Sequence, residues 1–487
     1  MTDILFTHSY FLKLDPKQWK LRQPYAPLGT LYAASLLREN GFSVALHDTM
    51  FCGKAADVVD VIKAQQPAYF VVYDDGFNYL TKMCLTNMRD AALEMIQFAS
   101  ILGCKIIVSS SDATDHKEKY FDSGADYVIK GEAEQTLLEL VQELEKHNPD
   151  INSIKGICYM KDNRMEVNEN RKVMKDLDLL PLPAWDLVDL KPYKKMWFKS
   201  AGYFSMNIAT TRGCPFKCNW CAKPIYGNRY NVRSPKEVIA EIKMIISKYD
   251  ADHIWFCDDI FGLKPGWVIA FAHLLKMENI RIRFRIQSRA DLLLQQDYVQ
   301  ALKDAGCETV WIGAESGSQK ILDAMDKGIT VEQIEKATVL LKQFQIKPCF
   351  FIQFGYLDES PSDIESTIQM IQRLMPHEIG ISVSYPLPGT PFYERVKTQL
   401  SKKSNWTDSD ELALMFRNQQ SSSYYKQLHR YVHKLFRTEM AWQQAKKLLK
   451  HPLQFNFNSL KKIIAGCYYL PSSYLAKTRL RQLENMK

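Results

Sequence analysis

The sequence predicts an α/β protein with three parts: an N-terminal doubly wound, Rossmann-like domain, a central partial (β/α)6 barrel and a helical C-terminal module. Two series of alternating strand and helix patterns predict the first two parts, and a proline-containing stretch separates them. After Pro391 the alternation gives way to helical patterns, which predict the third part. The 487 residues are 46% hydrophobic and 24% charged, an ordinary globular usage that excludes disordered and collagen-like classes.

Residues 1–150 form the predicted doubly wound domain. Its strands are expected at Ile4–Thr7, Ser43–Leu46, Ala68–Tyr73, Lys105–Ser109 and Tyr127–Ile129. Helical patterns lie between them around Leu28–Arg38, Ala55–Ala64, Met88–Leu102 and Glu134–Glu145. Sheets of this kind bind ligands at the carboxyl ends of their strands, so we expect the loops after these strands to form one edge of a site.

Residues 151–205 are predicted to join the two α/β parts. A hairpin is expected at Gly156–Met160 and Arg164–Val167. The following segment contains Pro181, Pro183 and Pro192, and its hydrophobic residues have no sustained periodicity. This predicts extended and turn geometry.

Residues 206–395 form the predicted barrel. Its six strands are expected at Asn207–Thr211, His253–Cys257, Ile282–Ile286, Thr309–Ile312, Lys347–Phe354 and Gly380–Ser384. Capping signals at Ser234, Thr330 and Ser360 mark the starts of three of the helices between them. In such barrels the chemistry lies at the carboxyl ends of the strands.

Residues 396–487 form the predicted helical module, and they carry the basic character of the chain. They contain 17 Lys and Arg against 5 Asp and Glu, a net charge of +12, whereas the first 395 residues carry −4. This charge suits an anionic substrate, an acidic protein, a phospholipid surface or RNA, and it does not choose among them. The aromatic residues of this module either cover the barrel mouth or form helix core: Tyr424, Tyr425, Tyr431, Phe436 and Trp442.

No targeting or membrane-spanning segment is predicted. The N-terminal residues lead directly into the first expected strand, without the basic and apolar regions of a signal peptide. The apolar stretch Ile463–Ala476 is shorter than the roughly 20 residues that a spanning helix needs, and Pro471 interrupts it. We therefore expect a cytoplasmic protein.

One cluster stands out among the eleven cysteines. Directly after the first barrel strand, Cys214, Cys218 and Cys221 have CxxxCxxC spacing. Three thiolates so close in sequence can converge on one metal centre, and sulfur ligands favour zinc or an iron–sulfur cluster. A structural zinc ion takes four protein ligands, but residues 159–252 contain no histidine and no other cysteine. The spacing therefore predicts three ligands and one open coordination position.

This motif, with Trp220 before its last cysteine and its place on the first βα loop of a barrel, resembles the motif of the radical S-adenosylmethionine (radical SAM) superfamily. The resemblance implies that Cys214, Cys218 and Cys221 hold three irons of a [4Fe-4S] cluster and that S-adenosylmethionine chelates the fourth. It further implies cleavage of the sulfonium to a 5′-deoxyadenosyl radical, with electrons from an external reductant such as flavodoxin or ferredoxin.

Polar residues after three further barrel strands match the same superfamily less specifically. Asp258 and Asp259 end the second strand, where family members place groups near the methionine ammonium, although an aspartate there can instead cap a helix. Arg289 follows the third strand and either meets the methionine carboxylate or remains solvated. Glu315 and Ser316 resemble the glycine-rich segment that binds ribose and methionine; the alternative is a helix start that needs small residues.

A doubly wound domain before such a barrel resembles the cobalamin-binding class of the superfamily, which includes anaerobic tetrapyrrole cyclases, hopanoid methylases, and methyltransferases for antibiotics and phosphinates. Pro27–Tyr32, Gly124–Glu132 and Leu182–Asp186 are similar to segments of that class. The resemblance implies cobalamin, although the DxHxxG string whose histidine coordinates cobalt does not occur in the sequence. Ser109 and Ser110 stand where a Gly-Gly pair usually admits the nucleotide tail, so they are the expected contacts.

We therefore expect a radical SAM enzyme that uses cobalamin to methylate, cyclise or rearrange a small organic metabolite, anionic and partly apolar in character. A tRNA methylthiotransferase has the same domain order but needs a second cluster on three N-terminal cysteines; Cys52 and Cys84 follow strands, whereas Cys104 precedes one. A cobalamin-free radical SAM enzyme and a metal-stabilised binding protein are further alternatives. Nucleic acid is not an expected partner, and peripheral membrane contact through the basic module stays open.

Overall fold

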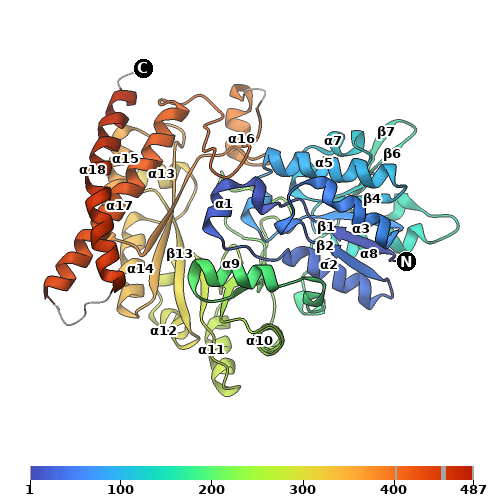
Figure 1. Ribbon diagram of the computed structural model, residues 1–487, viewed down its shortest axis with the longest axis horizontal. Helices are drawn as coiled ribbons and strands as arrows, with labels where there is room; N and C mark the ends of the chain where they lie inside the picture. The colour runs from blue at the N-terminus through green and yellow to red at the C-terminus, as the bar shows by residue number, and fades with distance from the viewer. Residues whose placement is uncertain (1, 401–402, 451–456, 485–487) are drawn as a thin grey trace. The chain divides into compact units, whose positions relative to one another are not determined.

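The computed structural model describes residues 2–400, 403–450 and 457–484 (Figure 1). The chain divides into two compact units. The first contains residues 1–216, 222–286 and 405–411, and the second contains residues 217–221, 287–404 and 412–487. The boundary crosses the cysteine loop, so Cys214 belongs to the first unit and Cys218 to the second.

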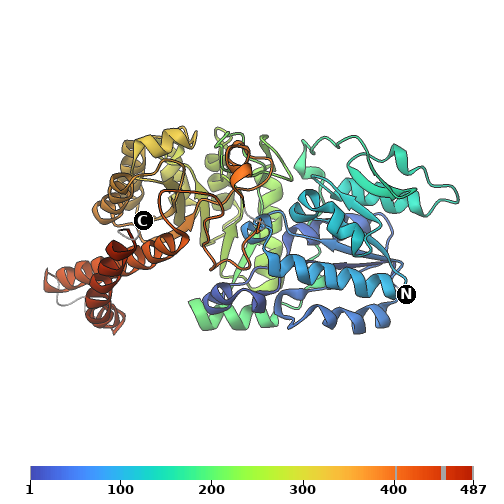
Figure 2. The same cartoon turned by 90° about the horizontal axis from the view of Figure 1, so that it is seen from above.

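A seven-stranded sheet forms the centre of the first unit (Figure 2). Its strands are β1 (Ile4–Thr7), β2 (Val44–His47), β3 (Tyr69–Tyr73), β4 (Lys105–Ser109), β5 (Tyr127–Ile129), β6 (Ile157–Lys161) and β7 (Arg164–Val167). Across the sheet they run in the order β2-β1-β3-β4-β5-β6-β7; β1 to β5 are parallel, and β6 and β7 are antiparallel additions. The predicted doubly wound domain and the predicted hairpin are both confirmed.

The strand order reverses beside β1. This strand pairs with β2 on one side and with β3 on the other. Ligands of doubly wound sheets bind at such a reversal, outside the carboxyl ends of the two strands. The loops after Thr7 and Tyr73 therefore mark the edge of interest in this sheet.

Helices cover both faces of this sheet. The longer ones are α2 (Leu28–Glu39), α3 (Val58–Gln65), α5 (Thr86–Ile101) and α8 (Glu134–Leu144), and the shorter ones are α1 (Pro16–Leu21), α4 (Tyr79–Lys82), α6 (Ser111–Asp115) and α7 (Lys117–Asp122). On one face, Leu37 of α2 and Leu137 and Val141 of α8 pack against Val71 and Ile107 of the sheet. Strands of a parallel sheet are covered on both faces, and accordingly β1 and β3 are buried throughout and are apolar except for Thr7.

The segment predicted to be extended contains a helix, α9 (Lys191–Ala201), so that prediction was wrong. Pro192 lies in the first turn, where a backbone N–H has no intrahelical acceptor and a proline costs nothing. Tyr193 and Trp197 of this helix are buried, and the Trp197 indole donates to the Pro24 carbonyl (2.7 Å). Burial of these aromatic residues stabilises a helix that the sequence pattern does not reveal.

Six strands form the second sheet: β8 (Ser205–Ile208), β11 (His253–Phe256), β12 (Phe284–Ser288), β13 (Cys307–Glu315), β14 (Lys347–Phe354) and β15 (Glu378–Val383). They follow one another in chain order, with parallel pairing in β8-β11-β12 and in β13-β14-β15. The connecting helices are α10 (Pro235–Tyr249), α11 (Trp267–Met277), α12 (Gln296–Asp304), α13 (Gln319–Ala324), α14 (Val331–Gln343) and α15 (Pro361–Leu374). The predicted partial barrel is confirmed, and β14 has the predicted bounds.

The predicted helix caps are present. Thr330 and Ser360 each form a reciprocal capping box, with Gln333 and Asp363 respectively. The Ser234 hydroxyl accepts from the Glu237 N–H at the start of α10. Each cap satisfies backbone N–H groups that have no partner inside the helix, which is why these short polar patterns locate helix starts reliably.

The C-terminal part is helical, as predicted. It contains α16 (Pro391–Val396), α17 (Ser422–Lys450) and α18 (Phe457–Glu484), and Pro471 lies inside α18 without ending it. Of the aromatic residues of α17, Tyr424, Tyr425, Tyr431 and Phe436 are buried, whereas Trp442 is exposed. No helix in the part of the chain that the structure describes has both the length and the apolar character to cross a membrane.

Candidate active site

The cysteine loop begins where β9 (Thr211–Arg212) pairs with β10 (Asn231–Val232) and closes the segment between them as a hairpin. Gly213 follows β9 with a φ of +82°, and a Cβ atom there would lie 2.4 Å from the carbonyl oxygen of Arg229. Only glycine fits both this conformation and this contact. The backbone is therefore fixed immediately before Cys214, which is itself buried.

Asn219 anchors the second half of the loop. Its backbone N–H donates to the Met325 carbonyl (3.1 Å), and its backbone carbonyl accepts from the N–H of a residue in the first turn of α16 (3.0 Å). Its side-chain amide donates to Asp326 Oδ2 (2.7 Å) and accepts from the Tyr356 hydroxyl (2.6 Å). All polar groups of this buried residue hold the turn between the second and third cysteines.

Cys218 and Cys221 lie on one tight turn, since the Cys221 N–H donates to the Cys218 carbonyl (3.2 Å). Trp220 between them packs against an apolar cluster that contains Ile321, Met325, Tyr356, Phe392, Val396 and Phe416. The buried indole Nε1 of Trp220 has no hydrogen-bond partner among the residues that the structure describes. The turn thus carries two cysteines on either side of a tryptophan that packs on an apolar cluster and keeps one unsatisfied donor.

Lys327 brings a buried positive charge to this turn. Its Nζ lies 2.7 Å from Glu315 Oε1, and these side chains are 8% and 6% exposed. Burial disfavours the ammonium, but the Glu315 carboxylate and the nearby Cys218 outweigh burial and raise the pKa of Lys327 above its usual value. Glu315 ends β13 with a φ of +59°, a strained conformation for a residue other than glycine.

Arg289 is held close to the same lysine. One guanidinium nitrogen donates to the Lys327 carbonyl (3.0 Å) and another to the Gly328 carbonyl (3.2 Å). The guanidinium also pairs with Asp291 (3.1 Å). The structure therefore brings two residues predicted from the sequence, Arg289 and Glu315, together through Lys327.

Ser316 lies in a tight contact with α15. Its hydroxyl lies 3.1 Å from the Thr367 hydroxyl and accepts from the Ser318 N–H (3.1 Å). A Cβ atom at Gly317 would lie 2.5 Å from the Ser366 carbonyl oxygen. The small residues after β13 are therefore required by close packing on the helix backbone, and the Ser316 hydroxyl is engaged in that contact.

The two aspartates after β11 have different environments. The buried Asp258 carboxylate accepts from the N–H groups of Thr210 (2.7 Å) and Thr211 (2.8 Å). Burial raises the pKa of Asp258 to about 7 in spite of these hydrogen bonds. Asp259 is more exposed and pairs with Lys82 (2.9 Å). Asp258 thus fixes the backbone that leads into the cysteine loop, whereas Asp259 contacts the doubly wound domain within the same unit.

Arg212 joins the cysteine loop to the doubly wound domain. Its guanidinium pairs with Glu132 (2.5 Å) and with Glu134 (2.6 Å), and all three side chains are buried. The guanidinium carbon also lies 5.1 Å from the centre of the Tyr226 ring. Two carboxylates and an aromatic face therefore compensate one buried cation two residues before Cys214.

Buried polar groups collect at the carboxyl ends of β1 and β3. Asp74 accepts from the Ser9 N–H (2.7 Å) and from its hydroxyl (2.9 Å). Asp75 accepts from the N–H groups of Gly29 (3.1 Å) and Phe77 (3.0 Å), and burial raises its pKa to about 6. These contacts lie at the reversal of strand order, the expected ligand edge of the sheet.

Ser109 ends β4 at the same edge and Ser110 follows it, and both are buried. The Ser109 carbonyl accepts from the Asp74 N–H (2.8 Å). The Ser110 hydroxyl caps α6 by accepting from the Ala113 N–H (2.8 Å). The structure therefore places both predicted serines beside the polar groups that follow β3.

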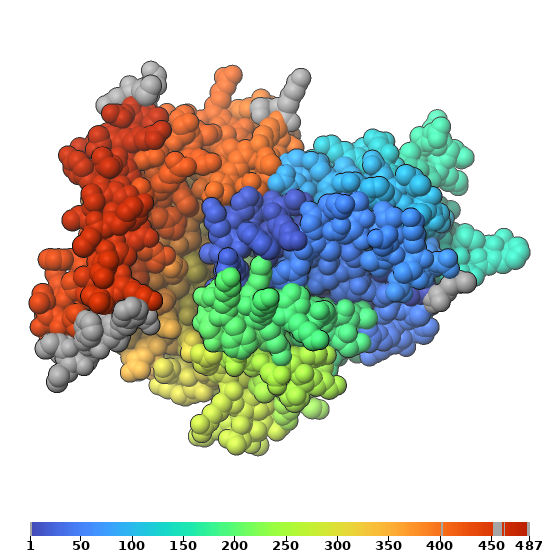
Figure 3. Space-filling model, viewed as in Figure 1, coloured from blue at the N-terminus to red at the C-terminus, as the bar shows by residue number. Residues whose placement is uncertain are grey.

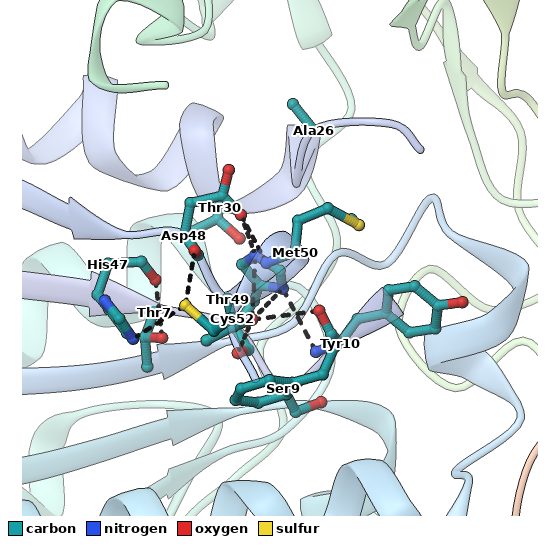
Figure 4. Close-up of polar contacts among 12 residues, drawn as sticks. Thr7, Ser9, Tyr10, Ala26, Thr30, His47, Asp48, Thr49, Met50 and Cys52 are labelled. Atoms are coloured by element: carbon teal, nitrogen blue, oxygen red, sulfur yellow. Dashed lines mark hydrogen bonds and ion pairs between the residues drawn. The ribbon is translucent and has the colours of Figure 1, made fainter. Parts of the chain in front are cut away.

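A second polar cluster lies after β1 and β2 (Figure 4). The Thr49 hydroxyl lies 3.1 Å from Nδ1 of His8, and Nε2 of the same histidine lies 2.9 Å from Asp48 Oδ1. His47 Nε2 lies 3.9 Å from the Cys52 thiol. Both ring nitrogens of His8 are thus engaged by protein groups.

Three residues of the site were not predicted from the sequence: Asn219, Lys327 and Tyr356. Asn219 stands inside the cysteine motif, and its place between two predicted ligands could have identified it. Tyr356 offers no local signal, because its partner Asn219 is 137 residues away. Lys327 lies in a short segment between two helices, where an exposed lysine is the ordinary expectation.

The chain is similar to known proteins in one domain and in its overall sequence. Residues 208–371 match the family model described as the Radical SAM superfamily. The chain is 27% identical over 395 residues to an uncharacterized methyltransferase of Pyrococcus horikoshii. This match covers 78% of the chain and 80% of that protein. The chain is 25% identical over 280 residues to the anaerobic magnesium-protoporphyrin IX monomethyl ester cyclase of Rubrivivax gelatinosus, covering 56% of this chain and about half (49%) of that relative.

Two solved structures have a similar fold. The radical S-adenosylmethionine methyltransferase TsrM from Kitasatospora setae, solved with cobalamin and a [4Fe-4S] cluster, superposes with a TM-score of 0.67 at 17% identity, covering 82% of this chain and 75% of that one. The cobalamin-dependent S-adenosylmethionine radical enzyme OxsB, solved with aqua-cobalamin bound, superposes with a TM-score of 0.74 at 17% identity, and the match covers 98% of this chain and 72% of that one. The comparisons lead to one conclusion: residues 208–371 of the chain match the Radical SAM superfamily, within a fold that is similar to that of TsrM and OxsB.

Proposed function

We propose that this enzyme cleaves S-adenosylmethionine with a [4Fe-4S] cluster on Cys214, Cys218 and Cys221, and that it uses cobalamin to methylate or cyclise a small organic molecule. The observation that carries the proposal is the donor set: three thiols within one loop whose backbone is anchored at Gly213 and Asn219. The names of the curated relatives, a methyltransferase and a cyclase, support both classes of reaction.

Three thiols on one loop are the donor chemistry that fits a cluster, although no three His, Cys, Asp or Glu side chains among the described residues already lie together as a metal site. When bound, the cluster and S-adenosylmethionine supply a one-electron cleavage that no amino-acid side chain can perform. The Lys327 ammonium near Cys218 is a positive charge that would offset the negative charge of a cluster held by thiolates. The unsatisfied indole N–H of Trp220 is a donor for a bound group. An external one-electron reductant such as flavodoxin or ferredoxin is the protein partner that this chemistry needs.

The edge of the doubly wound sheet fits a large polar cofactor. Ser109 and Ser110 are buried at the carboxyl end of β4, next to the polar groups that follow β3, whereas the N–H and hydroxyl of Ser9 are engaged by Asp74. Both ring nitrogens of His8 are engaged within the protein, so this histidine is not among the residues that we propose would hold cobalamin. TsrM and OxsB, which share the fold, were solved with cobalamin bound.

Anaerobic reconstitution tests the proposal. The purified chain is incubated with iron, sulfide and hydroxocobalamin, desalted, and assayed for iron and for corrinoid by absorption. We expect about four irons per chain together with a retained corrinoid. Cys218→Ala should lose iron and keep corrinoid, whereas the matched control Cys104→Ala, a half-buried thiol outside the loop, should retain both.

Other results of the same experiment would favour the alternative functions. Iron without corrinoid would make the enzyme cobalamin-free and leave the doubly wound domain as a scaffold. About eight irons would indicate the second cluster of a methylthiotransferase. Zinc in place of iron would contradict the proposed chemistry and favour a metal-stabilised binding protein.

A further inference from the structure

The two long C-terminal helices pack through small residues. A Cβ atom at Gly466 of α18 would lie 2.6 Å from the Ala441 Cβ of α17. The Gln427 side chain of α17 donates to the Ala476 carbonyl of α18 (2.9 Å). Ser473, Ala476 and Leu480 of α18 are buried. Gly466, Ser473, Ala476 and Leu480 recur at helical spacing, so one narrow face of α18 contacts α17.

The opposite face of α18 carries the large apolar side chains. Its most exposed apolar residues are between 59% and 73% exposed: Ile464, Tyr468, Leu470, Tyr474 and Leu475. Ile464, Tyr468 and Leu475 are four and seven residues apart and therefore share the side of the helix opposite Gly466 and Ser473, whereas Leu470 and Tyr474 lie about a third of a turn round the helix and flank that side. The helix lies along the outside of the second unit in the space-filling view (Figure 3). A helix on the surface of a unit ordinarily buries most of its large apolar residues, but these side chains are exposed and have no apolar cover among the residues of the unit that the structure describes.

Lysine and arginine residues lie close to these exposed apolar residues. The described segments of α17 and α18 contain 12 Lys and Arg against the two acidic residues Glu439 and Glu484. Lys477, Arg479 and Arg481 are exposed along the last turns of α18. On α17, Trp442 is exposed, and the Nζ of Lys446 lies 5.0 Å from its ring. The pair of helices thus combines exposed apolar and aromatic residues with a strong positive charge.

We propose that the outward face of α18 binds the surface of an anionic lipid bilayer, with the helix lying in the plane of the interface. Apolar residues on one face with tyrosine and lysine or arginine beside them are the composition of interfacial helices. The apolar side chains enter the headgroup boundary, and the cations pair with anionic headgroups. A second copy of the chain would cover the apolar residues but would bring two strongly positive surfaces together, which argues against that occupant.

Vesicle co-sedimentation tests this surface with the full chain. The vesicles consist of phosphatidylcholine alone or of phosphatidylcholine with 30% phosphatidylglycerol. We expect binding to the anionic vesicles that weakens as salt is raised, because screening reduces the headgroup attraction. Tyr474→Ser with Leu475→Ser, and separately Arg479→Glu with Arg481→Glu, should each lower the apparent partition coefficient by about tenfold or more.

Ile101→Ser is the matched control, since Ile101 of α5 is as exposed but lies in the first unit. This variant should leave vesicle binding unchanged. All variants should keep the wild-type iron content, so a loss of vesicle binding can be told apart from a loss of the proposed cluster. Absence of binding to anionic vesicles would overturn the proposal. A dimer by light scattering that the Tyr474→Ser, Leu475→Ser variant dissociates, without vesicle binding, would assign the face to a second copy instead.

Discussion

Arg212 Nη2 lies 2.6 Å from Glu134 Oε1, and the two side chains are 3% and 1% exposed. The pair connects the residue two positions before Cys214 to the first residue of α8. Loss of one partner from a buried ion pair leaves an uncompensated charge, which costs more than the pair itself contributes. The cysteine loop therefore depends on a carboxylate that lies 78 residues earlier in the chain.

Replacement of Arg212 by leucine should lower the free energy of unfolding by about 3–5 kcal/mol, because two buried carboxylates lose their cation. The triple variant Arg212→Leu, Glu132→Gln, Glu134→Gln should recover part of this loss, since no buried charge stays unpaired. Urea unfolding at pH 7.5, with iron content after reconstitution, measures both effects. Equal stability of the single and triple variants would show that charge compensation is not the reason.

Lys327 and Glu315 form a second buried pair, and a double-mutant cycle isolates it. Lys327→Met and Glu315→Gln should each destabilise the chain by about 3 kcal/mol, and the double variant should lose less than the sum of the two. Even so, the double variant should retain less iron than wild type, because the positive charge near Cys218 is gone. Additive losses in urea unfolding would contradict a direct coupling between the two side chains.

The pKa of Asp75 predicts a pH dependence of stability. Its folded-state pKa of about 6 lies above the value of an unfolded aspartate, so the folded chain binds the proton more tightly. This contribution to stability is full below about pH 4 and is lost as the pH rises through about 6.

Asp75→Asn should remove this dependence. The N–H groups of Gly29 and Phe77 both donate to Oδ1 of Asp75, and asparagine keeps an acceptor oxygen at this position. We expect the variant to match wild type near pH 4 and to exceed it at pH 7.5 by up to about 3 kcal/mol. Urea midpoints of the cofactor-free chain between pH 4 and 7.5 measure the difference; parallel profiles for the two proteins would refute the assignment.

Two glycines of the cysteine loop form a matched comparison. Gly213 and Gly227 have φ values of +82° and +67°, but only Gly213 has a backbone atom, the Arg229 oxygen, in the way of a Cβ. Gly227→Ala should cost about 1 kcal/mol from the left-handed conformation alone. Gly213→Ala should cost several times more and lower iron retention. Thermal unfolding and iron analysis of both variants check the expectation, and similar losses would contradict it.

Local patterns were enough to predict most elements of the fold. The apolar run Lys347–Phe354 is a strand with the predicted bounds, and the capping residues Thr330 and Ser360 begin helices as expected. These signals are carried by neighbouring residues, so tertiary contacts are not needed to interpret them. Helix α9 was missed because Pro192 was interpreted as a helix breaker, whereas the position of a proline within the first turn decides its effect.

The sequence by itself determined the family resemblance, the three cysteines and the order of the parts, because spacing and periodicity are local properties of the chain. Only the tertiary structure decided what surrounds them. Asn219, Lys327 and Arg212 have their roles through partners 107, 12 and 78 residues away. The outward apolar face of α18 likewise appears only when the face that packs on α17 is known. The physical reason is that burial and hydrogen bonding depend on which distant residues the fold brings together, which periodicity does not encode.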